Sequence, residues 1–118
     1  MTVATTDLSK LVTEVLDDRK GENIVTLQVG HLTTVTEAMV IVSGTSNRHV
    51  KSLVDYTITA VKDAGHQVFA VEGRDTNEWV LVDLGEILLH VMQKEVREFY
   101  DLERLWTELP SDNESSVE

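Results

Sequence analysis

A run of small residues, Ser43-Gly44-Thr45-Ser46, follows an apolar segment (39–42) and precedes a helical pattern. Strand, glycine turn and helix start form an arrangement that holds phosphate in many enzymes, because free N–H groups of the helix point at the anion. Nucleotidyl transfer would also need two or three carboxylates on nearby strands to hold a divalent metal. Glu72 and Asp83, each at the end of a predicted strand, are the candidates.

The same turn residues also suit a helix cap. Gly44 permits a sharp exit from the strand, and the hydroxyl of Thr45 or Ser46 can accept hydrogen bonds from the first helical turn, which stabilises a helix by about 1 kcal/mol. The strand predicted to carry the acidic pair (67–71) contains no acidic residue. Because a glycine turn alone is a weak signal, the sequence favours the cap over an active site.

Four histidines raise the question of a metal site. His31, His49 and His66 have no paired His or Cys at ligand spacing, whereas zinc needs three or four convergent ligands. The sequence therefore predicts no metal and no cofactor. His90 lies in a predicted strand, on the face opposite Leu89 and Val91, and two interpretations stay open: a satisfied half-buried side chain, or a polar contact in a docking surface.

Two aromatic residues, Trp79 and Tyr100, are candidates for protein contact. Trp79 opens a predicted strand directly after a charged loop (72–78), and Tyr100 follows Phe99 in the last predicted helix, so it is turned about 100° away if Phe99 faces the core. Large aromatics with one polar atom often anchor interfaces, although packing at the rim of the core is the alternative. We favour an interface. Acidic residues flank both positions, among them Glu72, Asp83 and Glu103.

The overall charge restricts the class of partner. The chain has 118 residues, a formal net charge of −11 and no cysteine. A surface this negative repels membranes and the phosphates of free nucleic acid but speeds encounters with basic proteins. No apolar run is long enough to span a bilayer, and no secretory signal is visible, so we expect a cytoplasmic protein. Simple solubility is the alternative reading of the charge.

Apolar periodicity predicts one α/β (α+β) domain: a mixed five-stranded sheet flanked by helices, in the order α-β-β-α-β-β-β-α. An amphipathic helix (8–16) has Thr6 or Asp7 as N-cap and ends at Gly21. Strands are expected at 25–29, 38–42, 67–71, 79–82 and 87–92, with residues 83–86 forcing an antiparallel hairpin. The second helix carries residues 50–61 and the last begins at Lys94. We expect a flexible N-terminus (1–6), one domain (7–109) and a disordered acidic tail (110–118).

Over residues 7–107 the chain resembles the ribosomal silencing factor family, the Iojap-like proteins. Four segments carry the resemblance in the family's order and spacing: VIVSGTSNRHV (40–50), VEG (71–73), WVLVDLGEILLHVM (79–92) and REFYDLERLW (97–106). The resemblance implies a nucleotidyltransferase-like fold without enzymatic activity. It also implies docking on the large ribosomal subunit through ribosomal protein L14, where the protein would block joining of the small subunit and lower translation when nutrients are scarce.

Under this resemblance the expected partner-binding residues are Glu72, Trp79, Asp83, His90, Tyr100 and Glu103. Two other functions stay open. A nucleotidyltransferase-like enzyme or nucleotide-binding protein would use the glycine turn, and a self-associating protein, such as a homodimer, would use the first strand (25–29) as an exposed edge.

Overall fold

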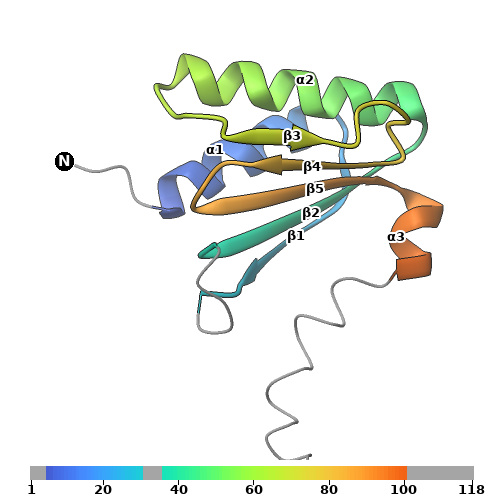
Figure 1. Ribbon diagram of the computed structural model, residues 1–118, viewed down its shortest axis with the longest axis horizontal. Helices are drawn as coiled ribbons and strands as arrows, with labels where there is room; N and C mark the ends of the chain where they lie inside the picture. Colours follow the sequence, from blue (N-terminus) through green and yellow to red (C-terminus); the bar gives the residue numbers. More distant parts are fainter. Residues whose placement is uncertain (1–4, 31–35, 101–118) are drawn as a thin grey trace, which may run out of the picture.

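The computed structural model describes residues 5–30 and 36–100 of the chain (Figure 1). Three helices and five strands follow one another in the predicted order. They are α1 (Thr5–Asp18), β1 (Glu22–Gln28), β2 (Ala38–Gly44), α2 (Asn47–Asp63), β3 (Ala70–Glu72), β4 (Trp79–Asp83), β5 (Ile87–Gln93) and α3 (Lys94–Tyr100).

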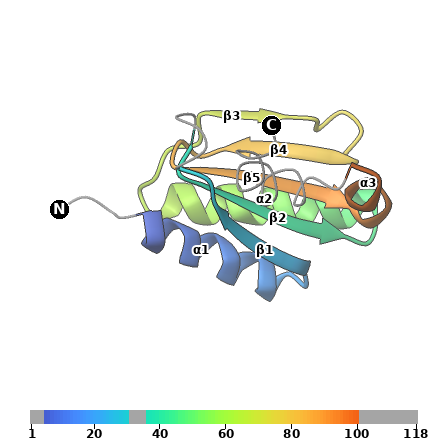
Figure 2. The same ribbon diagram turned by 90° about the horizontal axis from the view of Figure 1, so that it is seen from below.

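The five strands form one mixed sheet in the order β1-β2-β5-β4-β3. The central pair, β2 and β5, is parallel, and every other neighbouring pair is antiparallel. α1 and α2 lie side by side against one face of this sheet, and α3 lies at the end where β5 finishes (Figures 1 and 2). The predicted fold class, including the antiparallel hairpin of β4 and β5, is confirmed.

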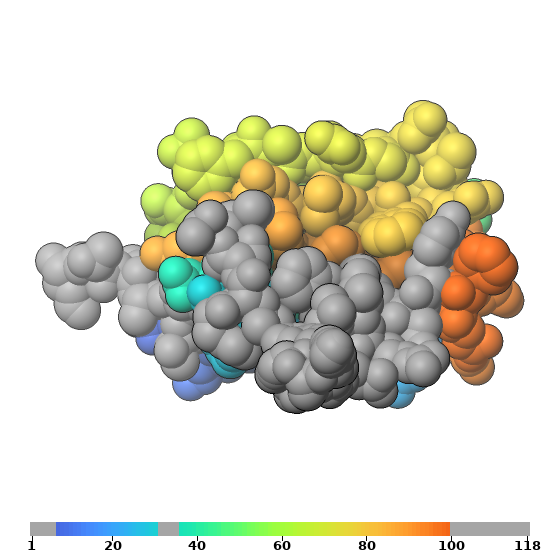
Figure 3. All heavy atoms as spheres, turned by 60° about the horizontal axis from the view of Figure 1, so that its bottom comes forward, coloured from blue at the N-terminus to red at the C-terminus, as the bar shows by residue number. Residues whose placement is uncertain are grey.

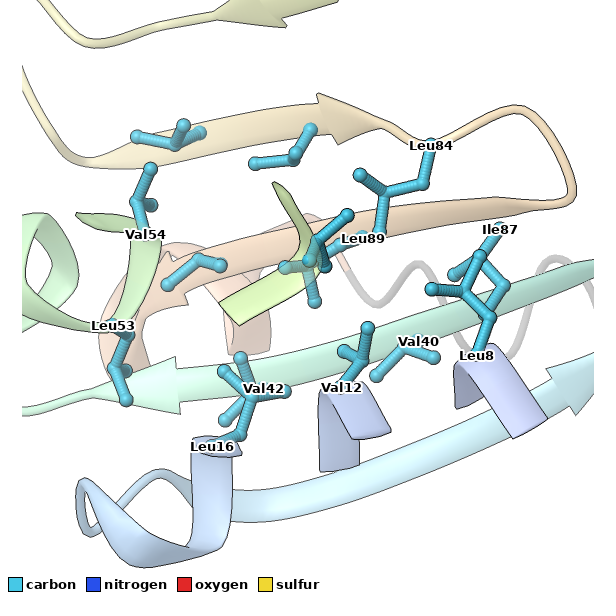
Figure 4. Packing of buried hydrophobic residues seen from close by; sticks show 14 of the residues in the cluster. Leu8, Val12, Leu16, Val40, Val42, Leu53, Val54, Leu84, Ile87 and Leu89 are labelled. Carbon is cyan, nitrogen blue, oxygen red and sulfur yellow. The ribbon is translucent and has the colours of Figure 1, made fainter. Parts of the chain in front are cut away.

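The main core lies between α1, α2 and the sheet, and we call the sheet face that it covers the helix face. Successive residues of a strand point to opposite faces of the sheet. Val40 and Val42 of β2 therefore lie on the helix face, where they align with Leu89 and Val91 of β5. The helix stripes supply the opposing layer (Figure 4). Its fully buried members include Val12, Leu16, Val50, Leu53, Val54 and Val61. The 3.6-residue apolar spacing thus decides which side of each helix is buried.

The third strand differs from its prediction. β3 spans only Ala70–Glu72, whereas residues 67–71 were expected to be extended and paired. Before it, the N–H of Phe69 donates to the carbonyl of Asp83 at 2.8 Å, but the Phe69 ring is 58% exposed. The predicted strand is thus shortened at its N-terminal end, where Gln67 and Phe69 are exposed and Val68 is half-buried.

Both ends of α1 also differ from prediction. The helix begins at Thr5, so Thr6 and Asp7 lie inside its first turn and not at the N-cap. At the other end Lys20, with φ +66°, takes the left-handed position, and the N–H of Gly21 donates to the carbonyl of Leu16 at 2.7 Å. Gly21 is instead required by close packing, because a Cβ there would lie 2.6 Å from Cγ2 of Val42.

β1 begins at Glu22, three residues before the predicted start, and a β-bulge interrupts its register between Glu22 and Val25. Within the described ranges, no helix is long and apolar enough to cross a membrane. The expected flexible N-terminus overlaps α1 at Thr5 and Thr6, and its remaining residues lie outside the described ranges, as does the whole expected tail (110–118).

Candidate functional site

The sheet face opposite the helices gathers four of the six predicted partner-binding residues. We call it the Trp79 face. Strand register aligns three rows of side chains on it: Trp79 with Met92, then Glu72 with Leu81, His90 and Ile41, then Ala70 with Asp83, Leu88 and Met39. Glu72, Trp79, Asp83 and His90, although up to eighteen positions apart in the chain, are therefore near neighbours. α3 reaches the same face through Val96.

Trp79 and His90 form a hydrogen-bonded pair on this face. Nε1–H of the Trp79 indole donates to Nδ1 of His90 at 3.0 Å, and the ring centroids are 5.9 Å apart with the planes tilted by 45°. Because Nδ1 accepts this bond, the proton of the neutral imidazole resides on Nε2. Trp79 is half-buried and packs against the apolar cluster of Met39, Ile41 and Met92. The pair thus fixes how the indole is presented on the sheet.

His90 is buried and neutral. Only 7% of the residue is exposed, and burial lowers the pKa of His90 from 6.5 to about 4, because a charged imidazole would lose its hydration. Nε2 is itself buried and has no hydrogen-bond partner within residues 36–100 or 5–30. His90 is therefore more buried than predicted, with one ring nitrogen satisfied inside the protein, and its contact with a partner stays a prediction.

A hollow of about 250 Å³ opens beside the pair, between the end of β3 and the start of β4. It is lined by Glu72, Gly73, Trp79, Leu81 and His90. Gly73 has φ +95°, and a Cβ there would lie 2.2 Å from the carbonyl oxygen of Trp79, so only glycine fits this position without moving the backbone. Glu72 is exposed and places a carboxylate at the rim.

Sequence analysis missed two residues of this hollow, Leu81 and Gly73. The signal for Leu81 was present, because it lies two positions after Trp79 in the same strand and must share its face. Gly73 follows Glu72 immediately in the VEG motif, and its left-handed φ accounts for a glycine there. The bond between Trp79 and His90 could have been found only from the register of the hairpin.

Asp83 serves the hairpin turn as well as the face. Its Oδ1 accepts a hydrogen bond from the N–H of Gly85 at 2.9 Å, and Gly85 has φ +84°. This is the local side-chain-to-backbone bond that aspartate makes in tight turns. Asp83 is half-buried, so one carboxylate oxygen is committed to the turn and the charge lies at the edge of the Trp79 face.

The remaining two predicted partner-binding residues cannot be placed with the others. Tyr100 is the last residue of α3, and its side chain lies outside the described part of the structure, as does Glu103. Phe99 does not face the core, because it is 79% exposed. The geometric reasoning that turned Tyr100 away from a buried Phe99 therefore does not apply, and both roles stay predictions.

α3 is fixed to the sheet by a buried arginine. Nη1 of Arg97 donates to Oγ of Ser43 at 3.0 Å, and Arg97 is only 7% exposed. A charge-assisted bond of this kind is stronger than a neutral one. It ties α3 to the end of β2, and so holds α3 at the border of the Trp79 face (Figure 3).

The turn after β2 makes a helix cap. Ser46 is the N-cap residue of α2, and its Oγ accepts from the N–H of His49 at 3.1 Å. Gly44 is buried within the strand end, where a Cβ would lie 2.8 Å from Cγ2 of Val50. The glycine thus permits close approach of strand and helix. The N–H of Thr45 donates to Nδ1 of His49 at 2.9 Å, so two N–H groups of this segment, those of Thr45 and His49, are bonded within the protein.

One of the two carboxylates proposed for nucleotidyl transfer, that of Asp83, lies far from this turn. In the sheet register Asp83 aligns with Met39, at the start of β2, whereas the turn follows Gly44, at its end. Five residues of strand separate the two rows, which is roughly 17 Å at 3.3 Å per residue. Within the described residues, no three His, Asp or Glu side chains converge as a metal site would require.

Comparison with known proteins gives consistent matches. The family model described as "Ribosomal silencing factor during starvation" matches residues 2–118. A protein named ribosomal silencing factor from Chromobacterium violaceum is 42% identical over 85% of this chain and 82% of its own length. A protein of the same name from Haemophilus influenzae is 42% identical over 84% of this chain and 97% of its own length. A mouse protein named for mitochondrial assembly of the ribosomal large subunit is 36% identical over 86% of the chain and 45% of its own length.

Solved structures agree with these matches. A crystal structure of a Chromobacterium violaceum protein superposes with a TM-score of 0.86 at 40% identity, covering 88% of this chain and 87% of that one. A Bacillus halodurans protein superposes with a TM-score of 0.79 at 29% identity, covering 86% of this chain and 95% of that one.

Proposed function

The chain belongs to the ribosomal silencing factor family, and from this premise we propose that it represses translation by occupying the large ribosomal subunit. The proposed contact is ribosomal protein L14, at the surface where the small subunit joins. Bound there, the protein would keep the subunits apart and lower translation under nutrient limitation. It would act in the cytoplasm by obstruction, without transforming a substrate.

The observation that supports this proposal best is the composition of the Trp79 face. A half-buried indole at the centre, a buried neutral imidazole beside it and carboxylates of Glu72 and Asp83 at the rim form an aromatic centre with an acidic border. Aromatic residues tend to dominate binding energy at the centre of an interface, and rim charges chiefly raise the association rate. With a net charge of −11, this border suits a basic ribosomal protein.

An enzymatic function receives no comparable support. The glycine turn is used for capping by Ser46 and His49, and the carboxylate of Asp83 lies at the other end of the sheet. A thermal-shift measurement with ATP and magnesium tests this alternative, since a nucleotide at a hundred times its dissociation constant would stabilise the fold by about 2.7 kcal/mol. We expect no shift.

The proposal is tested by sedimentation and light scattering with purified subunits. We expect the protein to travel with the large subunit and not with the small one, and to reduce formation of joined ribosomes in proportion to the amount bound. Crosslinking of the complex should identify L14 as the neighbour. Co-sedimentation without any effect on subunit joining would overturn obstruction as the mechanism.

A homodimer is an additional possibility. β1 lies at one edge of the sheet, so the first strand has the exposed position that self-association would need. Sedimentation equilibrium of the free protein tests this prediction independently of ribosome binding.

A further inference from the structure

The hollow beside Trp79 has the components of a site for a positively charged side chain. It combines a carboxylate (Glu72), an indole (Trp79) and an aliphatic wall (Leu81), and Gly73 completes its lining. Lysine and arginine side chains consist of an apolar stem and a charged end, so they bind where apolar surface and an acidic group are adjacent. Indole is also the aromatic ring that interacts best with cations.

We propose that this hollow is a socket for one lysine or arginine side chain of the protein partner, with Glu72 pairing its charge and Trp79 and Leu81 contacting its stem. The inference rests on the proposed function, because it names the chemistry of the group that the Trp79 face recognises. A volume of about 250 Å³ accommodates one such side chain but not a folded element.

His90 contributes to the socket in two ways. Since burial lowers the pKa of His90 to about 4, the imidazole is neutral at physiological pH and does not repel an incoming cation. Its Nδ1 holds the Trp79 indole at 3.0 Å and so fixes the ring that forms one wall.

The charge of the surroundings favours a cation over other ligands. Glu72 is exposed at the end of an edge strand, and Asp83 lies two positions beyond Leu81 on the same face. Arg74, the nearest basic residue in the chain, is turned to α2, where Nη2 pairs with Asp55. Its guanidinium is therefore paired with Asp55, and among the described residues Glu72 forms no salt bridge.

The test uses charge reversal at two matched positions. Glu72→Lys changes the socket, whereas Glu14→Lys makes the same change of net charge on an exposed position of α1, which packs on the other face of the sheet. Binding of each full-length variant to purified large subunits is measured by co-sedimentation. We expect Glu72→Lys to weaken binding by roughly tenfold or more and Glu14→Lys by about twofold or less. Equal losses in the two variants would overturn the socket, since only overall charge would then matter.

A second measurement tests binding of a basic side chain to the socket in the absence of ribosomes. The indole N–H resonance of Trp79, assigned with a Trp106→Phe variant, is followed by NMR while N-acetyl-arginine methylamide or its uncharged norleucine analogue is added. We expect a saturable shift with the arginine compound only, abolished by Glu72→Lys. If wild-type protein fails to sediment with large subunits but shows this shift, the proposed function fails and the socket stands. If it sediments but both compounds act alike, the socket fails alone.

Discussion

The two faces of the sheet are built from different kinds of side chain, although the same strands supply both. On the helix face, β5 presents Leu89 and Val91, which are fully buried beneath α1 and α2. On the Trp79 face, the intervening His90 bonds to an indole and keeps a buried donor unused. Folding alone favours the first arrangement, because an unpaired buried polar group costs free energy. The contrast indicates that one face is shaped for stability and the other for contact.

Truncation of the helix face should have the largest effect on stability. Leu89→Ala removes a fully buried side chain at the centre of the core, and we expect it to lower the free energy of unfolding by about 2–5 kcal/mol. Leu88→Ala, one position earlier in the strand and half-buried on the Trp79 face, should cost about 1 kcal/mol. Urea unfolding of both variants measures the difference. Similar losses would mean that the two faces contribute alike to stability and that the contrast is wrong.

Truncation of the Trp79 face should chiefly affect binding. We expect Trp79→Ala to weaken association with large subunits by roughly thirtyfold, equivalent to about 2 kcal/mol, while the circular dichroism spectrum stays that of the folded protein. Trp79→Phe keeps a ring but removes the donor to His90, and should give an intermediate loss. A Trp79→Ala protein that is unfolded would show that this residue is part of the core.

The pH dependence of stability should report the burial of His90. Its pKa is about 4 in the folded protein and near 6.5 when unfolded, so the unfolded chain binds more protons between these values. The stabilisation is complete above pH 6.5 and is lost as pH falls towards 4, amounting to roughly 2 kcal/mol by pH 5. Urea unfolding of the wild type should therefore weaken more between pH 7 and pH 5 than that of His90→Leu. Parallel curves would show that His90 titrates normally.

The sequence predicts the difference between the two faces where it depends on residues that are close together along the chain. The alternation of Leu89, His90 and Val91 assigns each to a face directly, and the structure agrees. The short connection after Asp83 predicts the hairpin and hence its register. That register places Trp79 diagonally across from His90, so the bond between them followed from information that the sequence holds in principle.

Other features could not be predicted because they depend on packing between distant segments. Gly21 and Gly44 look like turn residues, but each is needed where another backbone or side chain comes close, against Val42 and Val50. Phe69 has the apolar character of a strand residue, yet it lies before β3 and is largely exposed. The type of a residue does not show which distant segment will pack against it, so the sequence alone cannot predict these contacts.

We expect the smallest effect on binding and stability at Asp83, whose side chain both borders the Trp79 face and bonds to the hairpin turn. Asp83 borders the Trp79 face, but its Oδ1 is bonded to the N–H of Gly85 in the hairpin turn. Asp83→Asn keeps that acceptor and removes only the charge, so the free energy of unfolding should change by less than about 0.5 kcal/mol. A rim charge acts mainly on encounter, so we expect the association rate with large subunits to fall by about twofold at low salt and the difference to vanish as salt rises.

Asp63→Asn is the matched control for this last change, because it removes one charge from the exposed end of α2, away from the Trp79 face. Stopped-flow association of both variants over a range of salt concentrations separates local from overall charge. If Asp63→Asn slows association as much as Asp83→Asn, the acidic border contributes only through net charge. If Asp83→Asn alone is slower and the difference disappears with salt, Asp83 belongs to the contacting face even though its carboxylate also closes the hairpin.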